Sequence, residues 1–291
     1  MPTATPIADP QTIVRDAIKG VTTLATLPEI TTRIIATIED PRSSVGKLHA
    51  IVSHDPALAT RILKVVNSAF YGLPGRIASV ERAISLLGLT AVKNIAVAAS
   101  LGQMFRGSKL CDGFTVRDLW THCVAVGVTA RELARRLQIQ IADEAFLAGL
   151  IHDVGILVEL QTWPEQIRAV CKSVSSGHGN FCDAERDAMR VDHQVLGKGL
   201  TEHWNFPQGC QDAAGFHHNP GLVGEESRTL VALVHAADTL CCRSNQGFNL
   251  TALNQSPDDA AIASIGIDAA MMEAVAANLN HSVAEAISVF N

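Results

Sequence analysis

Apolar residues recur at helical spacing along almost the whole chain, and this pattern restricts the folds open to it. In "DPALATRILKVVNSAFYG" (55–72), Leu58, Ile62 and Val65 fall three or four residues apart, on one helical face. Asp55, which a proline follows, is a typical helix start, because its carboxylate caps free backbone amides and proline fits the first turn. Sustained alternation of polar and apolar residues, the mark of a half-buried strand, is lacking. The sequence therefore predicts an all-α fold.

The same periodicity outlines the individual helices. In the second half of the chain we expect helices at about 143–160, 164–176, 182–204, 208–218 and 226–243. A connector at 107–115 leads into a helix that Thr115 and Asp118 open as a capping box. Ser256 and Asp268 are expected to cap two helices near the C-terminus.

The chain divides into four expected parts. They are a loose N-terminal arm over 1–15, an N-terminal helical half over 16–110, a second helical half over 111–245 and a C-terminal helical extension over 246–291.

Composition excludes several classes of protein. The 23 basic and 29 acidic residues give a net charge of -6, without a basic run, so we expect no nucleic-acid partner. Seven cysteines without CxxC spacing favour reduced, buried thiols over a disulfide framework or a thiolate zinc site. We identify no basic and apolar leader, and no apolar run approaching the roughly 20 residues needed to span a bilayer. These features predict a cytoplasmic protein without a membrane partner.

Several ionisable residues fall on apolar helix faces of the second half. Asp153 lies within "DEAFLAGLIHDVGILVEL" (143–160), among Leu150, Val154 and Leu157. An ionised carboxylate in such surroundings is costly unless it is paired, hydrogen-bonded or bound to a metal. The other polar residues in inward-facing or neighbouring positions are His122, His152, His193, His217, His218 and Asp238.

Each of these side chains has an ordinary interpretation and a functional one. A single histidine on an apolar face is commonly a hydrogen-bonded core residue, and adjacent histidines can cap a helix end. As a set, however, imidazoles and carboxylates suit Fe, Mn, Co, Ni or Zn, and seven candidates exceed the four ligands of a tetrahedral zinc site. Two ions bridged by Asp153 would use the surplus. His235, one turn before Asp238, is either a core hydrogen-bonding residue or a support for the ligands.

From about residue 20 to 220 the chain resembles the HDOD family, the HD-related output domain of bacterial signalling proteins. The first half carries "LPEITTRIIATIEDPRSSVGKLHAIVSHDPALATRILKVVNSAFYG" and "SVERAISLLG". The second half carries "LWTHCVAVG", "FLAGLIHDVGILV", "DHQVLGKGLTEHWNFP" and "FHH". This family is a divergent branch of the HD superfamily of metal-dependent phosphohydrolases. The resemblance therefore implies a multi-helix HD-superfamily-like bundle with an N-terminal helical subdomain.

The resemblance also implies a set of ligands for a divalent metal, a set that could hold one ion or two. Fe or Mn is favoured, and Zn, Ni and Co are alternatives. The positions that match the superfamily's metal ligands are His122, His152, Asp153, His193, His217, His218 and Asp238.

Two departures from the superfamily pattern point away from catalysis. Active members commonly place a lysine, which can hold a substrate phosphate, where this chain has Ile156. The cyclic di-GMP phosphodiesterase branch continues its double histidine into a GYP loop, where this chain reads "HHNPGLVGEES". We therefore expect a regulatory output domain that binds a signalling protein in trans or a small phosphorylated ligand, without cyclic di-GMP hydrolysis. The alternative is a metal-dependent phosphohydrolase of unknown phosphoester or nucleotide substrate, with Asp153 as its catalytic residue.

Overall fold

The structure is a computed structural model. It describes residues 9–290 except 22–23, 25–26, 38–39, 41, 69–70, 106 and 108. The regular elements within these residues are all helices, which confirms the predicted all-α class. A single isolated β-bridge among them joins Cys111 to Phe114. The residues between are Asp112 and Gly113, a dipeptide that favours tight turns, so the expected connector contains a small closed loop.

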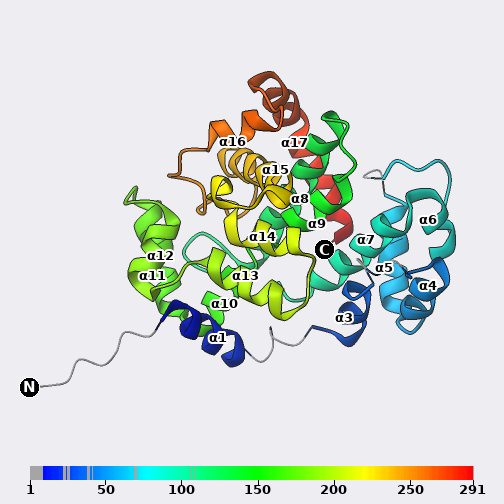
Figure 1. The fold of residues 1–291 in the computed structure, drawn as a ribbon, viewed down its shortest axis with the longest axis horizontal. Helices are drawn as coiled ribbons and strands as arrows, with labels where there is room; N and C mark the ends of the chain where they lie inside the picture. Colours follow the sequence, from blue (N-terminus) through cyan, green and yellow to red (C-terminus); the bar gives the residue numbers. More distant parts are fainter. Residues whose placement is uncertain are drawn as a thin grey trace, which may run out of the picture.

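The N-terminal helices gather on one side of the molecule (Figure 1). They are α3 (Glu29–Ile35), α4 (Val45–Ser53), α5 (Pro56–Val66), α6 (Val80–Leu87) and α7 (Leu89–Leu101). Asp55 caps α5 as predicted, accepting a hydrogen bond of 2.9 Å from the Leu58 amide. Helix α7 packs against α3, α5 and α6 and also against α9 of the second half. It therefore links the two halves of the fold.

The second half is built around α8 (Val116–Arg136), which packs against α9, α15 and α17. Thr115 and Asp118 form the predicted capping box at its start. The remaining elements are α9 (Ala142–Ile151), α10 (Gly155–Thr162), α11 (Pro164–Ser175), α12 (Phe181–Met189), α13 (His193–His203), α14 (Gln208–Phe216), the 3-10 helix η1 (Pro220–Leu222) and α15 (Glu225–Arg243).

Two of the expected helices are broken. The expected helix over 143–160 is interrupted after Ile151, and α10 begins at Gly155, whose backbone lies against α13. The expected helix over 182–204 ends at Met189, because Arg190 adopts a left-handed φ of 69° and Asp192 caps a new helix. Both breaks place candidate ligands at helix ends, where side chains from several helices can meet.

The N-terminal arm is shorter than expected. Residues 1–8 lie outside the described part of the chain, but α1 (Pro10–Gly20) already occupies most of the remainder of the expected arm. Proline is suited to the first turn of a helix, and Val14 and Ile18 supply a buried face. This face packs on α13, beneath α10 and α13 in Figure 1, and so against the second half.

Two helices complete the chain, α16 (Asp259–Ser264) and α17 (Ala269–Phe290). The cap of α16 is Asp258, which accepts from the Ala261 amide at 2.9 Å, and the prediction of Ser256 was wrong. Asp268 accepts from the Met271 amide at 2.8 Å, as predicted. Helix α17 packs on α8 and α5, so it contacts both halves of the fold.

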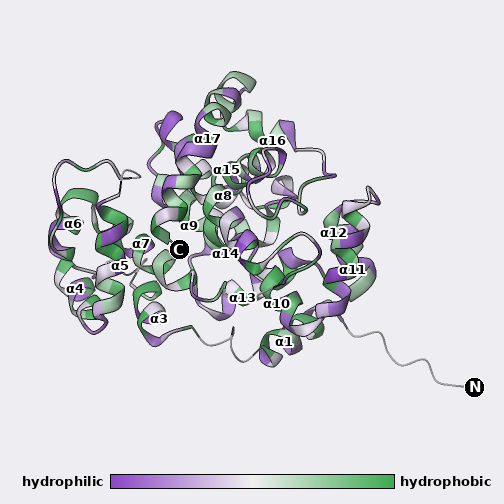
Figure 2. Ribbon diagram, turned by 180° about the vertical axis from the view of Figure 1, so that it is seen from behind, coloured by the Kyte–Doolittle hydropathy of each residue, from purple (hydrophilic) through white to green (hydrophobic). Residues whose placement is uncertain are grey.

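One apolar stretch is longer than the sequence analysis allowed. Residues Ala142–Thr162 form 21 residues that could cross a membrane by length and composition alone. In the folded chain 83% of the most apolar window is buried. The segment comprises α9 and the whole of α10, and Figure 2 shows α9 near the centre of the molecule and α10 beside α13. We therefore assign it to the protein core.

Candidate metal centre

Two glycines bring α8 and α9 into backbone contact. A Cβ on Gly127 would lie 2.7 Å from the carbonyl oxygen of Phe146, and a Cβ on Gly149 would lie 2.8 Å from the Cα of Gly127. Both distances are shorter than carbon contacts allow, so only glycine permits this approach. As a result, His122 on α8 comes close to His152 at the end of α9.

A third glycine brings α10 against α13. A Cβ on Gly155 would lie 1.9 Å from the carbonyl oxygen of His193 and 2.7 Å from the amide nitrogen of Gly197. The start of α10 is therefore held against the first turns of α13. Asp153, two residues earlier, is placed beside the His193 ring.

The Asp153 carboxylate lies between two pairs of histidines. Its Oδ2 atom is 3.3 Å from His152 Nε2 and 3.7 Å from His122 Nε2. Its Oδ1 atom is 3.4 Å from Nε2 of both His193 and His217. Each carboxylate oxygen therefore faces its own pair of imidazoles, the arrangement expected of a carboxylate shared by two ions.

Asp238 and His218 complete the cluster. Asp238 Oδ1 lies 3.1 Å from His122 Nε2, and its Oδ2 lies 3.7 Å from His218 Nδ1. We call His122, His152 and Asp238, around Asp153 Oδ2, the first ligand group. We call His193, His217 and His218, around Asp153 Oδ1, the second ligand group. The structure thus brings together all seven side chains singled out in the sequence.

The hydrogen bonds of the histidines determine which nitrogen faces the centre. Backbone carbonyls accept from Nδ1 of three rings: Gln246 O for His122 at 3.1 Å, Gly149 O for His152 at 2.7 Å and Ala213 O for His217 at 3.0 Å. A carbonyl can only accept, so Nδ1 carries the hydrogen, and in the neutral ring Nε2 keeps its lone pair. These lone pairs are directed at the carboxylates.

The centre therefore concentrates acceptors, while the Cys242 thiol donates to Asp238 Oδ1 at 3.3 Å. His193 Nε2 and His217 Nε2 are 3.3 Å apart, and the Nδ1 atoms of both rings are already hydrogen-bonded. Neither oxygen of Asp153 has a hydrogen-bond donor among the described residues. Such a cluster is unfavourable unless a cation or extra protons lie within it. Imidazole nitrogen and carboxylate oxygen are good ligands for Fe, Mn, Co, Ni and Zn, so these residues fit a divalent metal.

The surroundings also favour the protonation states that bind metal. Burial lowers the pKa of His218 well below its usual value, so this ring is neutral near pH 7. Burial alone would raise the pKa of Asp153, but positive charge on the facing imidazoles, above all that of His152, outweighs it and holds the pKa well below its usual value. The pKa of Asp238 is lowered in the same way, chiefly by the facing His122.

Two buried glutamates beside the centre escaped the sequence analysis. Glu159 on α10 and Glu185 on α12 are both 0% exposed. Burial, together with the facing Glu185, raises the pKa of Glu159 well above its usual value. The signal for Glu159 was present, since it interrupts the apolar run "GILVEL" as Asp153 interrupts "LIHDVG". Glu185 gave no such signal, because its helix is amphipathic and rich in charge.

His235 supports the centre without entering it. Its Nδ1 donates to the carbonyl oxygen of His217 at 2.6 Å, and its Nε2 accepts from the Asp258 amide at 2.8 Å. Both interpretations of this residue therefore hold, since it is a hydrogen-bonded core histidine that fixes the backbone of a candidate ligand.

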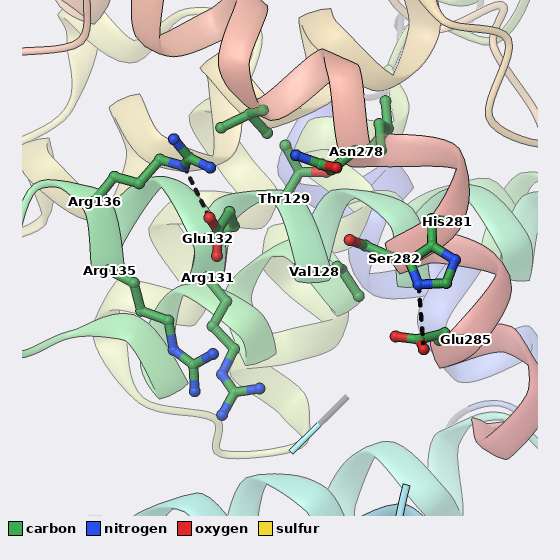
Figure 3. Close-up of a pocket in the computed structure, with 12 residues that line it drawn as sticks. Val128, Thr129, Arg131, Glu132, Arg135, Arg136, Asn278, His281, Ser282 and Glu285 are labelled. Carbon is green, nitrogen blue, oxygen red and sulfur yellow. Dashed lines mark hydrogen bonds and ion pairs between the residues drawn. The ribbon is translucent and has the colours of Figure 1, made fainter. Parts of the chain in front are cut away.

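The centre is closed to solvent. Its seven side chains belong to residues between 0% and 5% exposed. Ile156, at the position where the resemblance implies a lysine in active enzymes, is 0% exposed. Elsewhere, a cavity of about 370 Å³ lies between α8 and α17, lined by residues such as Arg131, Arg135 and His281 (Figure 3). None of the seven side chains lines that cavity.

An all-α bundle in which a His-Asp pair and further histidines and aspartates converge from several helices defines an HD-type domain. Within that class, the chain belongs to the HDOD domain family, which it matches over residues 24–220.

Solved structures of relatives share the fold. An HDOD domain protein of unknown function from Geobacter sulfurreducens is 24% identical, with a TM-score of 0.78 over 96% of each chain. A Marinobacter aquaeolei VT8 protein, provisionally named a signal transduction protein, is 26% identical with a TM-score of 0.76, over 96% of this chain and 64% of that one. A Shewanella amazonensis SB2B protein, provisionally named a phosphohydrolase, is 21% identical with a TM-score of 0.72, over 96% of this chain and 98% of that one.

Among curated proteins, an uncharacterized protein from Treponema pallidum (strain Nichols) is 28% identical over 216 residues. The match covers 73% of this chain but 41% of the relative. The chain therefore spans less than half the length of this relative.

Proposed function

We propose that this chain is a cytoplasmic regulatory module that binds a signalling protein in trans or a small phosphorylated ligand, and that a buried divalent metal centre organises its core. The observation that carries this proposal is the closure of the centre, whose ligands are at most 5% exposed. Asp153 itself is 0% exposed, so within the described residues a phosphoester does not reach it in this conformation. A metal held there acts on the fold of the surrounding helices, because the two ligand groups draw on α8, α13, α14 and α15 as well as the turn after α9.

The residue at position 156, where active members of the superfamily commonly have a lysine, supports the same conclusion. Ile156 is buried and cannot offer a charge to a phosphate. The name of the Marinobacter relative agrees with a signalling role. The seven free, buried cysteines agree with a reducing compartment such as the cytoplasm.

A single purified sample tests the proposal. Elemental analysis should find a divalent metal, with Fe or Mn expected ahead of Zn, Ni or Co. A screen of bis-p-nitrophenyl phosphate, nucleotides and cyclic di-GMP with added Mn²⁺ or Fe²⁺ should find no turnover. Turnover that is abolished in Asp153→Ala would overturn the regulatory proposal.

The geometry also favours one alternative, a metal-dependent phosphohydrolase. Two ligand groups that share a carboxylate suit a pair of ions, and such pairs stabilise charge and activate water in phosphoester hydrolysis. In that case Asp153 would hold both ions, and the histidines and Asp238 would complete their shells. The helices around the centre would have to open, so turnover would require a second conformation.

For the small phosphorylated ligand, we propose the cavity between α8 and α17. Figure 3 shows Arg131 and Arg135 extending side by side. Arg131 pairs with Asp143 at 3.4 Å, Glu132 with Arg136 at 2.8 Å and Glu285 with His281 at 3.4 Å. Burial and the nearby Arg131 charge lower the pKa of Arg135, a repulsion that a bound anion would relieve.

Calorimetric titration with inorganic pyrophosphate tests this cavity. Arg135→Gln should weaken binding about 10-fold, the effect of losing one charge-assisted contact. The control Arg117→Gln changes an exposed arginine of the same helix and should bind as the wild type does. Equal binding by all three proteins would exclude the cavity.

A further inference from the structure

Glu185 makes an unusually complete set of contacts with one candidate ligand. Its two carboxylate oxygens accept from Nδ1 of His193 at 2.9 and 2.8 Å, and Oε2 also accepts from the backbone amide of His193 at 3.2 Å. Both residues are 0% exposed. The carboxylate therefore holds the ring and the backbone of His193 together, in a place where water cannot substitute for it.

This contact decides which way the His193 ring faces. A carboxylate that accepts from Nδ1 directs the Nε2 lone pair of the neutral ring to the opposite side. On that side lie Asp153 Oδ1 at 3.4 Å and His217 Nε2 at 3.3 Å, the core of the second ligand group. Carboxylates that hold a metal-binding histidine in this way also raise its basicity.

His193 differs in this respect from its neighbours. The Nδ1 atoms of His122, His152 and His217 are held by backbone carbonyls, which no substitution removes. The Nδ1 of His193 is held by a side chain from another helix, α12. The orientation of His193 can therefore be altered by a single substitution that leaves every candidate ligand in place.

The support of His193 is itself tied to the surrounding helices. Glu159 on α10 lies near the Glu185 carboxyl group, close enough for each to shift the pKa of the other. Arg186, the next residue on α12, pairs with Asp192, which caps the helix that begins with His193. Helix α12 is therefore fixed relative to the start of α13 at two neighbouring positions.

We propose that Glu185 is a positioning residue for the second ligand group, which orients His193 to bind a divalent cation and sets the affinity of that group without affecting the first. The inference rests on the metal centre of the proposed function. Beyond the proposed function, this inference assigns a role to a residue outside the seven candidate ligands and predicts that the two ion sites differ in their dependence on it.

Titration of the full-length, chelator-treated protein with Mn²⁺, followed by electron paramagnetic resonance, tests the proposal. The wild type should bind two ions. Glu185→Ala should weaken one of them by about 10- to 100-fold and leave the other unchanged, the usual effect of removing a support of a metal ligand. Glu185→Gln should cause a loss of only about 5-fold, because the oxygen of the new amide can still accept from Nδ1 of His193.

A matched control is Asp187→Ala, which removes an exposed carboxylate from the same helix and should match the wild type. If Glu185→Ala does not fold, as judged by circular dichroism, the graded effect of Glu185→Gln decides. A nitrogen NMR measurement of the His193 ring should show hydrogen on Nδ1 in the metal-free wild type and a mixture of tautomers in Glu185→Ala.

The outcomes separate the two proposals. Two ions bound with wild-type affinities by both Glu185 variants would overturn the positioning role alone, as would an equal loss at both sites. A wild type that binds no Mn²⁺ or Fe²⁺ would overturn the metal centre and, with it, this role.

Discussion

The substitution Asp153→Asn removes the negative charge that both ligand groups share, while it keeps the size of the side chain. In the structure each Asp153 oxygen faces a different pair of imidazoles, at 3.3 to 3.7 Å. An amide offers a single oxygen and places a donor NH₂ where the other oxygen stood. The variant is therefore expected to bind neither ion well.

The size of the effect follows from the linkage between metal binding and folding. A single ion that is present at 1,000 times its Kd stabilises the folded state by about 4 kcal/mol. For a chain of nearly 300 residues, 1 kcal/mol shifts Tm by roughly 2 °C. Saturating Mn²⁺ should therefore raise the Tm of the wild type by at least about 8 °C, and should raise that of Asp153→Asn by less than about 2 °C.

The assay is thermal unfolding of chelator-treated protein at increasing Mn²⁺ concentration. The control is Asp212→Asn, which changes a carboxylate that is 9% exposed and whose partners, Ser227, Gln208 and Lys198, are not candidate ligands. It should keep the full metal-dependent shift. An Asp153→Asn protein that also keeps the full shift would refute the assignment of Asp153 as the shared ligand.

Three further predictions concern the packing and electrostatics of the centre. Gly155→Ala should destabilise the protein by about 4 kcal/mol or more in urea unfolding, because its Cβ would lie 1.9 Å from the His193 carbonyl oxygen. The control Gly224→Ala, whose Cβ would have nothing within 4 Å, should cost less than about 1 kcal/mol. Equal losses of unfolding free energy in the two variants would contradict the close packing at Gly155. The pKa of Glu159 is raised in the folded protein, so its contribution to stability is full below about pH 4.5 and falls as the pH rises towards its folded pKa. Glu159→Gln removes this loss. It should therefore stabilise the protein increasingly above about pH 4.5, by about 1 kcal/mol per pH unit. Urea unfolding at pH 5 and pH 7.5 measures this gain, and a gain that is the same at both pH values would speak against a raised pKa. EDTA should remove the metal slowly, because the ligand residues are at most 5% exposed. The rate should increase in urea too dilute to unfold the whole protein, since urea favours local opening. Complete loss of metal within the mixing time would show that the centre is open.

The fold class and the individual capping residues were predictable because they depend on local chemistry. Asp55 before a proline, and Thr115 with Asp118, both cap the helices they were expected to cap. The breaks at 152–154 and 190–192 were not predicted. One depends on the contact of Gly155 with α13, a long-range feature, and the other on Asp192, whose capping potential was overlooked within an apolar periodicity.

The seven candidate ligands could be found from the sequence because each interrupts or borders an apolar face, a costly position that calls for a partner. Their grouping around the two oxygens of Asp153 depends on the packing of separate helices and was visible only in the structure. Glu185 illustrates the limit of this reasoning. Its burial arises from the docking of α12 on α13, and nothing in the local pattern of α12 marks it as different from the exposed Asp187 two residues later.

The glycine contacts on either side of the His-Asp pair separate the framework of the centre from its chemistry. Gly127, Gly149 and Gly155 hold backbones together, and none of them depends on the identity of a ligand side chain. A chain of this kind can exchange or lose individual ligand side chains while these backbone contacts keep the helices around the centre in place. The ligands at this position of the fold can therefore be replaced, by mutation or by design, to bind a different ion or none.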